Sequence, residues 1–382
     1  MSSIDTLLVH GANDKVTYAR EVNVPIYLTA TFEQKSFDDH SGYGYARGNN
    51  PTRESLEHLI AALEGGKHAF GFASGMAATS AALSLFSAGD KVLVIGMIYG
   101  GTYGVLNNVF SGFGIKWELV DIDKSEDLEQ YITDDVKGVF FETPVNPTLK
   151  VNDIRGIASV AKKHSLLTIV DNTFMSPFAQ RPLELGIDVV VESATKYLGG
   201  HSDIIAGIAA VNDDKLAERI HMIQALQGGI IQPFDAYQLI RSIKTLGVRV
   251  RQQTYNAGKI AEFLAGNEAV KTVHYPGLES DPGYELQKSQ TDYPGAMLSF
   301  ELADGYCPAK FLDSLKIFTL GASLGGVESL IGHPATTSHR SIPEDVSKKF
   351  GISDLLIRVS PGIEDTQELI DDLAQALKLA KK

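Results

Sequence analysis

Short apolar runs alternate with helix-length segments between about residue 56 and residue 244, and this alternation limits the fold more than any other feature of the chain. We predict strands at 69–73, 92–95, 115–120, 139–141, 166–170, 189–191 and 204–211. Parallel strands need long crossover connections, usually helices. The pattern therefore predicts an α/β protein built on a mostly parallel, seven-stranded sheet.

Lys196 lies in the stretch ESATKYLGGHSD, directly after one of these apolar runs. Its amine is therefore expected at the C-terminal edge of the sheet, where open α/β sheets bind ligands. Ser193 and Thr195 are two residues apart, so their hydroxyls would point the same way in an extended segment. Two hydroxyls beside a lysine suit a phosphate on a molecule that also carries an aldehyde. The alternative is a solvated surface lysine, the commonest role of this residue type.

Asp171 and Thr173 follow the run 166–170, at the same edge of the predicted sheet. A carboxylate at such a position could simply cap the next turn. Beside a lysine that binds an aldehyde, Asp171 could instead pair with the pyridinium nitrogen of pyridoxal phosphate.

Ser74, Gly75 and Met76 follow the first predicted strand and open an alanine-rich segment. The amides of Gly75 and Met76 would face a phosphate at the N-terminus of a helix. A Ser-Gly pair is also an ordinary helix cap, so this motif alone decides little.

The composition narrows the class of protein and its partners. The 382 residues carry a net charge of −13, which disfavours nucleic acid and anionic membranes as partners. Cys307 is the only cysteine, which fits a reducing cytoplasm, and no run approaches the length of a membrane span. No metal site is predicted.

Six motifs together resemble one known family, the cystathionine γ-synthase, γ-lyase and β-lyase family of pyridoxal phosphate enzymes, also called the trans-sulfuration family. They are ASGMAA, YGGTY, ETPVNPT, VDNTF, SATKYLGGHSD and SLGGVESL. The resemblance covers nearly the whole chain and implies the type I fold of pyridoxal phosphate-dependent transferases, as in aspartate aminotransferase. It also implies an N-terminal arm (1–55), a large cofactor domain (56–244), a smaller C-terminal α/β domain (245–382) and a homotetramer of two catalytic dimers.

The resemblance assigns roles to residues of the cofactor site. Lys196 would hold the cofactor as an internal aldimine and then move protons, while Asp171 would pair with the ring nitrogen. Tyr99 would stack on the ring and act as an acid or base, and Asn146 would contact the ring oxygen. The remaining cofactor residues are Ser74, Gly75, Met76, Thr173, Ser193 and Thr195, with Tyr45 and Arg47 reaching the phosphate of the neighbouring subunit's cofactor.

The substrate would be an amino acid whose α-carboxylate binds Arg358, with Asn146 and Ser323 beside it. The resemblance is weaker at the substrate's far end. Family members that act on cystathionine usually carry an arginine and a glutamate at the positions of Gly104 and Ala322. Methionine-specific members carry a cysteine where this chain has Gly101.

The expected activity is that of a carbon–sulfur lyase of the cystathionine γ-lyase or β-lyase type, with cysteine desulfhydrase activity. The alternatives are the replacement reactions of cystathionine γ-synthase or O-acetylhomoserine sulfhydrylase, methionine γ-lyase, and a non-catalytic protein that binds pyridoxal phosphate. The sequence alone does not separate β from γ cleavage.

Overall fold

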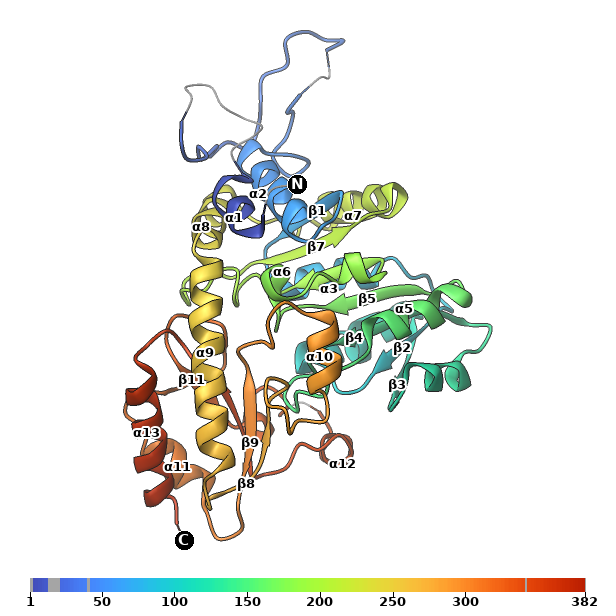
Figure 1. Ribbon diagram of the computed structural model, residues 1–382. Helices are drawn as coiled ribbons and strands as arrows, with labels where there is room; N and C mark the ends of the chain where they lie inside the picture. The colour runs from blue at the N-terminus through green and yellow to red at the C-terminus, as the bar shows by residue number, and fades with distance from the viewer. Residues whose placement is uncertain (1–2, 13–20, 40–41, 341, 382) are drawn as a thin grey trace.

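The computed structural model describes residues 3–12, 21–39, 42–340 and 342–381. Two sheets organise it (Figure 1). The strands of the larger sheet are β1 (His68–Phe72), β2 (Lys91–Ile95), β3 (Lys116–Val120), β4 (Val136–Glu142), β5 (Leu167–Asp171), β6 (Val189–Glu192) and β7 (Gly207–Val211). Each lies on one of the predicted apolar runs. The predicted run 204–211 is longer than the strand, because pairing begins only at Gly207.

The larger sheet has the order β1-β7-β6-β5-β4-β2-β3. Strand β7 is antiparallel to both of its neighbours, whereas the pairs from β6 through to β3 are parallel. This confirms the predicted mostly parallel seven-stranded sheet. Because the parallel strands share a direction, the residues that follow β1, β2, β4, β5 and β6 meet at one edge.

Both faces of this sheet are buried, which explains why its strands read as continuous apolar runs. In β2, for example, Val92 and Val94 belong to the core on one face, and Leu93 and Ile95 to the core on the other. Alternate side chains of a strand point to opposite faces, so a strand covered on both sides has no polar face.

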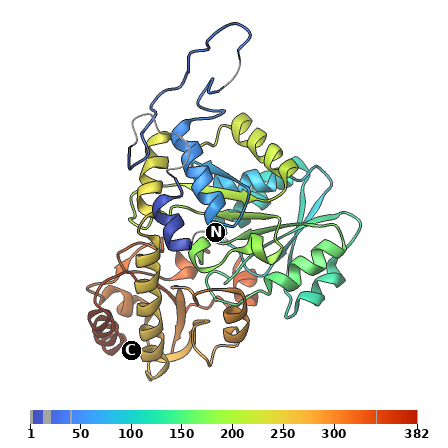
Figure 2. The same cartoon turned by 45° about the horizontal axis from the view of Figure 1, so that its top comes forward.

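Helices cover these faces and connect the strands (Figures 1 and 2). They are α1 (Ile4–His10), α2 (Pro51–Leu63), α3 (Gly75–Leu83), α4 (Gly100–Val105), α5 (Ile154–Lys163), α6 (Ser176–Ala179), α7 (Asp214–Gln227) and α8 (Pro233–Ile243). The C-terminal part of the chain contributes the helices α9 (Leu246–Ala265), α10 (Tyr284–Gln290), α11 (Pro308–Asp313), α12 (Glu344–Lys349) and α13 (Thr366–Leu379). Helix α13 begins after Asp365, whose carboxylate caps it by accepting hydrogen bonds from the backbone amides of Gln367 and Glu368.

A smaller sheet lies in the C-terminal part, in the order β10-β11-β12-β9-β8. Its strands are β8 (Val270–His274), β9 (Leu298–Leu302), β10 (Thr319–Leu320), β11 (Leu330–Gly332) and β12 (Leu356–Ser360). Helix α9 runs along both halves of the molecule in Figure 1. Its Leu246 and Val250 belong to the core of the large sheet, whereas Ile260 and Leu264 belong to that of the small sheet. The boundary predicted at residue 244 precedes this shared helix, and the three-part division stays a prediction.

Part of the described segment between α1 and α2 projects from the body as an extended loop (Figures 1 and 2). A backbone bridge joins Thr31 to Tyr45, so the loop folds back on itself before it enters α2. Of the predicted arm, residues 1–2, 13–20 and 40–41 lie outside the described residues.

Candidate active site

A cavity of about 290 Å³ lies at the edge where the parallel strands end. It is lined by Ser74, Gly75, Met76, Thr79, Tyr99, Thr102, Glu142, Pro144, Asn146, Asp171, Thr173, Phe174, Ser193, Thr195, Lys196, Ile205, Ala322, Ser323, Leu324, Ser338 and Arg358. The structure therefore brings together every predicted site residue except Tyr45 and Arg47.

Lys196 reaches the cavity from a tight turn that follows β6. The expectation of an extended segment is wrong here, since the Lys196 amide bonds to the carbonyl of Ser193 at 3.1 Å and the Gly200 amide to that of Lys196 at 2.7 Å. Ser193 and Thr195 both line the cavity, but the Thr195 hydroxyl is already hydrogen-bonded to the backbone. It donates to the Ala206 carbonyl at 3.2 Å and accepts from the Ala206 amide at 3.0 Å.

The amine of Lys196 donates a hydrogen bond to the Ser323 hydroxyl at 3.0 Å. Burial and then the nearby Arg358 guanidinium lower the pKa of this amine from 10.5 to about 8. Roughly a tenth of the amine is therefore neutral at pH 7, and about half at pH 8. A neutral amine is what attack on an aldehyde and proton abstraction both require.

Asp171 is the last residue of β5, and its carboxylate is held by one neighbour. Oδ1 accepts from the Thr173 hydroxyl at 2.5 Å and from the Thr173 amide at 3.0 Å. The same hydroxyl oxygen accepts from the Ser193 amide at 2.8 Å, which ties the ends of β5 and β6 together. Burial raises the pKa of Asp171, and the Thr173 bonds oppose this. A cationic group beside Asp171 would keep it ionised.

Ser74, Gly75 and Met76 form the first turn of α3. The Ser74 hydroxyl caps the helix by accepting from the Ala77 amide at 3.1 Å. The amides of Gly75 and Met76 precede the helix's own hydrogen bonds, so they are open to an anion. A Cβ at Gly75 would lie 2.7 Å from that of Ser193, so only glycine fits between the helix and the lysine turn.

Tyr99 is the cap residue of α4, and its side chain is 44% exposed. Its amide donates to the Glu142 carboxylate at 2.6 Å. Burial and then Asp171 raise the pKa of Glu142 well above its ordinary value. Sequence reasoning missed Glu142, although it ends a strand and opens the motif that contains Asn146.

Arg358, in β12, is buried and reaches across to the large sheet. Its guanidinium donates to the Asn146 side-chain oxygen at 3.1 Å and to the Ser323 carbonyl at 3.1 Å. Burial lowers the pKa of Arg358 to about 10, so the group stays cationic at neutral pH. The three predicted substrate residues therefore form one bonded cluster.

Tyr45 and Arg47 lie outside this cavity. The Tyr45 side chain is 54% exposed, and the Arg47 guanidinium lies 5.7 Å from the centre of its ring. Arg47 also donates to the carbonyl of Ala225 near the end of α7. Within one chain, the described residues of the arm therefore do not line the cavity that holds Lys196.

A pair of buried acids lies behind Asp171, and sequence reasoning missed it. Glu64 and Glu192 are 0% and 2% exposed and lie close enough for each carboxyl group to shift the pKa of the other. The side-chain amide of Asn172 donates to Glu192 at 2.8 Å, whereas neither carboxyl oxygen of Glu64 has a hydrogen-bond partner among the described residues. Burial raises the pKa of both acids, so the pair retains a proton.

The cavity is also lined by residues that no sequence motif indicated, such as Ile205 and Ser338. Ala322 lines the cavity, but Gly104 does not. A Cβ at Gly104 would meet open space. A Cβ at Gly101 would lie 2.5 Å from the Tyr99 ring, so a side chain there would displace the tyrosine.

The donor set fits pyridoxal phosphate. The α3 N-terminus with Ser193 offers an anion cradle, and Asp171 offers a half-buried carboxylate that needs a cationic partner. The Lys196 amine can bind an aldehyde. These three groups face one cavity, as the three reactive ends of the cofactor require.

Comparisons with known proteins agree with this geometry. The family model described as Cys/Met metabolism PLP-dependent enzyme matches residues 5–378. The chain is 47% identical to the cystathionine β-lyase of Lactococcus lactis subsp. cremoris (strain MG1363), over 99% of this chain and 100% of that protein. It is 45% identical to the cystathionine γ-lyase of Bacillus subtilis (strain 168), over 98% of each. The solved cystathionine γ-lyase of Lactobacillus plantarum, complexed with L-serine, superposes with a TM-score of 0.97 at 41% identity, over 99% of each chain.

Within the described part of the chain, no helix combines the length and the apolar character that crossing a membrane requires.

Proposed function

Because the chain belongs to the family of Cys/Met metabolism PLP-dependent enzymes, we propose that it is a carbon–sulfur lyase of the cystathionine β-lyase or γ-lyase type, with cysteine desulfhydrase activity. The observation that carries the proposal is one cavity that holds both the Lys196 amine and the Arg358 guanidinium. The named lyases to which the chain is similar along its whole length support the reaction type.

Each end of the cofactor has a holder in this chain. The amides of Gly75 and Met76 with Ser193 would take the phosphate, Asp171 the ring nitrogen, and Lys196 the aldehyde. Asn146 and Tyr99 would contact the ring. Bound in this way, pyridoxal phosphate supplies an electron sink for the negative charge that develops at the substrate's α carbon.

Lys196 is the proposed base and acid at the reacting carbons. Its pKa of about 8 lets it take a proton as a neutral amine and return it as an ammonium near neutral pH. The Ser323 hydroxyl, 3.0 Å away, orients the amine in the cavity.

Arg358 is the proposed anchor of the substrate's α-carboxylate. Its bonds to Asn146 and to the Ser323 carbonyl use only part of a guanidinium that has five N–H donors. The Arg358 guanidinium is already desolvated and fixed, so binding a carboxylate costs little further loss of side-chain freedom.

Tyr99 is the proposed acid for the departing sulfur. Its amide is fixed by Glu142, while its partly exposed ring lines the cavity. The ring can therefore lie over a bound cofactor while its hydroxyl reaches a leaving group.

The assembly is proposed to be a homotetramer of two catalytic dimers, located in the cytoplasm. Tyr45 and Arg47 do not line the cavity of their own chain, and they belong to the segment before α2, part of which projects from the body (Figure 1). We therefore propose that they grip the cofactor phosphate in the neighbouring subunit. The replacement reactions and methionine γ-lyase remain the alternatives, and Gly101 beneath the Tyr99 ring disfavours the latter.

One assay separates these activities. The purified enzyme is given cystathionine, cysteine, methionine and O-acetylhomoserine separately, and pyruvate, 2-oxobutyrate and sulfide are measured. A lyase releases an oxo acid from cystathionine without a thiol acceptor. Turnover of O-acetylhomoserine only when a thiol is added would instead identify a replacement enzyme.

A further inference from the structure

Residues at the start of α2 bind both ends of the projecting loop. At the N-terminal end of the loop, the side-chain amide of Asn50 donates to the Tyr27 carbonyl at 2.9 Å. The Thr52 hydroxyl donates to the Pro25 carbonyl at 2.9 Å. These bonds attach one end of the loop to the start of the helix.

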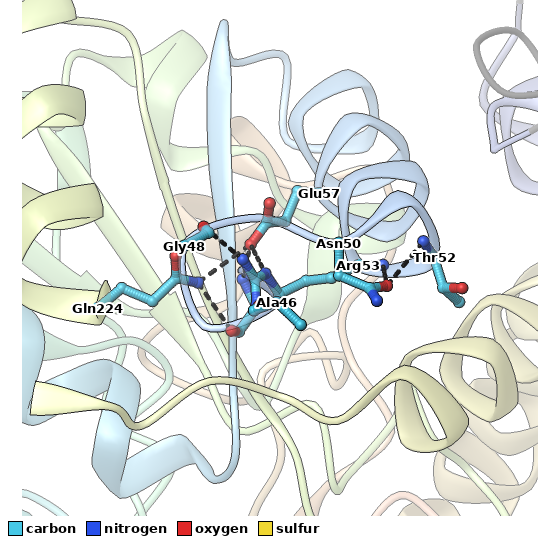
Figure 3. A network of polar contacts seen from close by, with 8 residues as sticks. Ala46, Gly48, Asn50, Thr52, Arg53, Glu57 and Gln224 are labelled. Carbon is cyan, nitrogen blue, oxygen red and sulfur yellow. Dashed lines mark hydrogen bonds and ion pairs between the residues drawn. The ribbon is translucent and has the colours of Figure 1, made fainter. Parts of the chain in front are cut away.

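Arg53 binds the C-terminal end of the loop, at residues 46–48. This residue is 2% exposed, and its guanidinium donates to the Ala46 carbonyl at 2.8 Å and to the Gly48 carbonyl at 2.6 Å. Figure 3 shows the guanidinium between these two carbonyls. Arg47 is the residue between them, so Arg53 fixes the backbone on both sides of Arg47.

The Arg53 guanidinium is in turn fixed by an ion pair with Glu57. Its Nε lies 3.4 Å from Glu57, one turn later in α2. The Glu57 carboxylate accepts from the Gly71 amide of β1 at 2.9 Å and from the Gln224 side chain of α7 at 3.0 Å. The guanidinium is therefore anchored to the large sheet, which makes it a fixed support for a loop that otherwise projects.

We propose that Arg53 is a positioning residue whose effect is felt in the neighbouring subunit, where it holds Tyr45 and Arg47 in the arrangement that grips the cofactor phosphate. The inference rests on the proposed role of the arm. Arg53 touches neither the cavity of its own chain nor, in this arrangement, the phosphate itself.

The physical reason is preorganisation. A flexible loop must be ordered when it grips a phosphate, and this ordering subtracts from the affinity. Two charge-assisted bonds to carbonyls order the loop beforehand. Arg53→Lys keeps the charge but lacks the planar fork that reaches both carbonyls at once. We expect cofactor affinity to fall roughly tenfold to hundredfold, the usual effect of losing one such bond.

The test uses cofactor binding, with no need for turnover. Apoenzyme is titrated with pyridoxal phosphate, and borohydride fixes the cofactor only at sites that carry Lys196. Arg53→Lys should bind weakly as a homo-oligomer. In a hybrid dimer with Lys196→Ala, the site that carries Lys196 lies in the Arg53→Lys subunit but receives its arm from the other subunit. That site should regain wild-type affinity.

Arg249 provides a matched control. It is also buried, at 3% exposed, and donates to the Tyr197 carbonyl at 2.7 Å and the Ser242 carbonyl at 3.0 Å, but it supports the turn that carries Lys196. Arg249→Lys acts within its own subunit, so its hybrid with Lys196→Ala should stay weak. Circular dichroism verifies folding of each variant, and Arg53→Met serves as a second substitution that also removes the charge.

Arg47→Ala distinguishes a failure of the shared site from a failure of the proposed role of Arg53. If its hybrid with Lys196→Ala recovers but that of Arg53→Lys does not, Arg53 serves its own subunit and the inference is wrong, while the shared site stands. If the Arg47→Ala hybrid also stays weak in cofactor affinity despite verified assembly, the arm does not act across the interface. That result would overturn both the shared site and the positioning role of Arg53. Wild-type affinity in the Arg53→Lys homo-oligomer would equally overturn the inference.

Discussion

The amine of Lys196 donates a 3.0 Å hydrogen bond to the hydroxyl of Ser323, which lies between β10 and β11. The bond joins the turn after β6 to the C-terminal part of the chain. Ser323 also contributes its carbonyl to Arg358. One residue therefore links the proposed base to the proposed carboxylate anchor.

Lys196→Ala should abolish turnover and the visible absorbance of the bound cofactor, because no other lysine lines the cavity within the described residues. The fold should be unchanged, since the amine makes a single side-chain bond. Activity, absorbance and circular dichroism are compared with those of the exposed control Lys215→Ala. A borohydride-reducible bond between the cofactor and a different lysine would show that the assignment is wrong.

Cofactor incorporation should depend on pH with a midpoint near 8. Burial and Arg358 lower the pKa of Lys196 to about 8, and only the neutral amine attacks an aldehyde. The rate constant should therefore rise about tenfold per pH unit well below pH 8 and level off above it. Stopped-flow absorbance between pH 6 and 9.5 measures it. Arg358→Gln removes the nearby cation and should move the midpoint upward, whereas a midpoint near 10.5 in the wild type would contradict the prediction.

Arg47→Ala and Lys196→Ala should each be nearly inactive alone, yet recover activity when subunits are mixed and reassembled. The hybrid dimer contains one site with an intact lysine and an intact arm. Activity is measured on hybrids isolated through two different affinity tags. Recovery to less than a few per cent, with assembly verified, would argue against a shared site.

The sheet was predictable because its strands are buried on both faces. Runs such as 92–95 are therefore apolar at every position, which makes them easy to identify in the sequence. The lysine, aspartate and helix-cap motifs were predictable because they follow those strands directly. Long-range contacts were not. Nothing in the sequence distinguishes Glu64 from an exposed acid, because its burial arises from packing against Glu192 across the fold. The turn around Thr195 was misjudged because a tertiary bond to Ala206 overrides local propensity.

Glu64→Gln should stabilise the enzyme increasingly as the pH rises. Burial raises the pKa of Glu64 from 4.5 to about 8, so the folded state holds a proton more tightly than the unfolded state does. This contribution to stability is fully present below about pH 4.5 and is lost as the pH rises toward 8, at up to about 1.4 kcal/mol per pH unit. Thermal midpoints at pH 5.5 and pH 8 should therefore differ less in the variant. The exposed control Glu218→Gln should follow the wild type, and equal slopes for all three proteins would refute the shared proton.

The last prediction concerns the substrate's far end. Ala322 lines the cavity next to Ser323, at the position where the family resemblance leads us to expect a glutamate in members that act on cystathionine. The missing charge-assisted contact corresponds to about 1.5 to 3 kcal/mol, or roughly tenfold to hundredfold in binding. We expect the enzyme to discriminate weakly between cystathionine and smaller substrates such as cysteine or O-acetylhomoserine.

Ala322→Glu should raise kcat/KM for cystathionine relative to cysteine, because the new carboxylate can pair with the distal ammonium of cystathionine. Ala322→Gln has the same length without the charge, so it should give little of this gain. The side chain would enter a cavity that already contains the Arg358 cation, which favours an added anion. Full kinetics on both substrates measure the ratio. If the wild type already prefers cystathionine by several orders of magnitude, and Ala322→Glu leaves the ratio unchanged, then some other residue recognises the distal group.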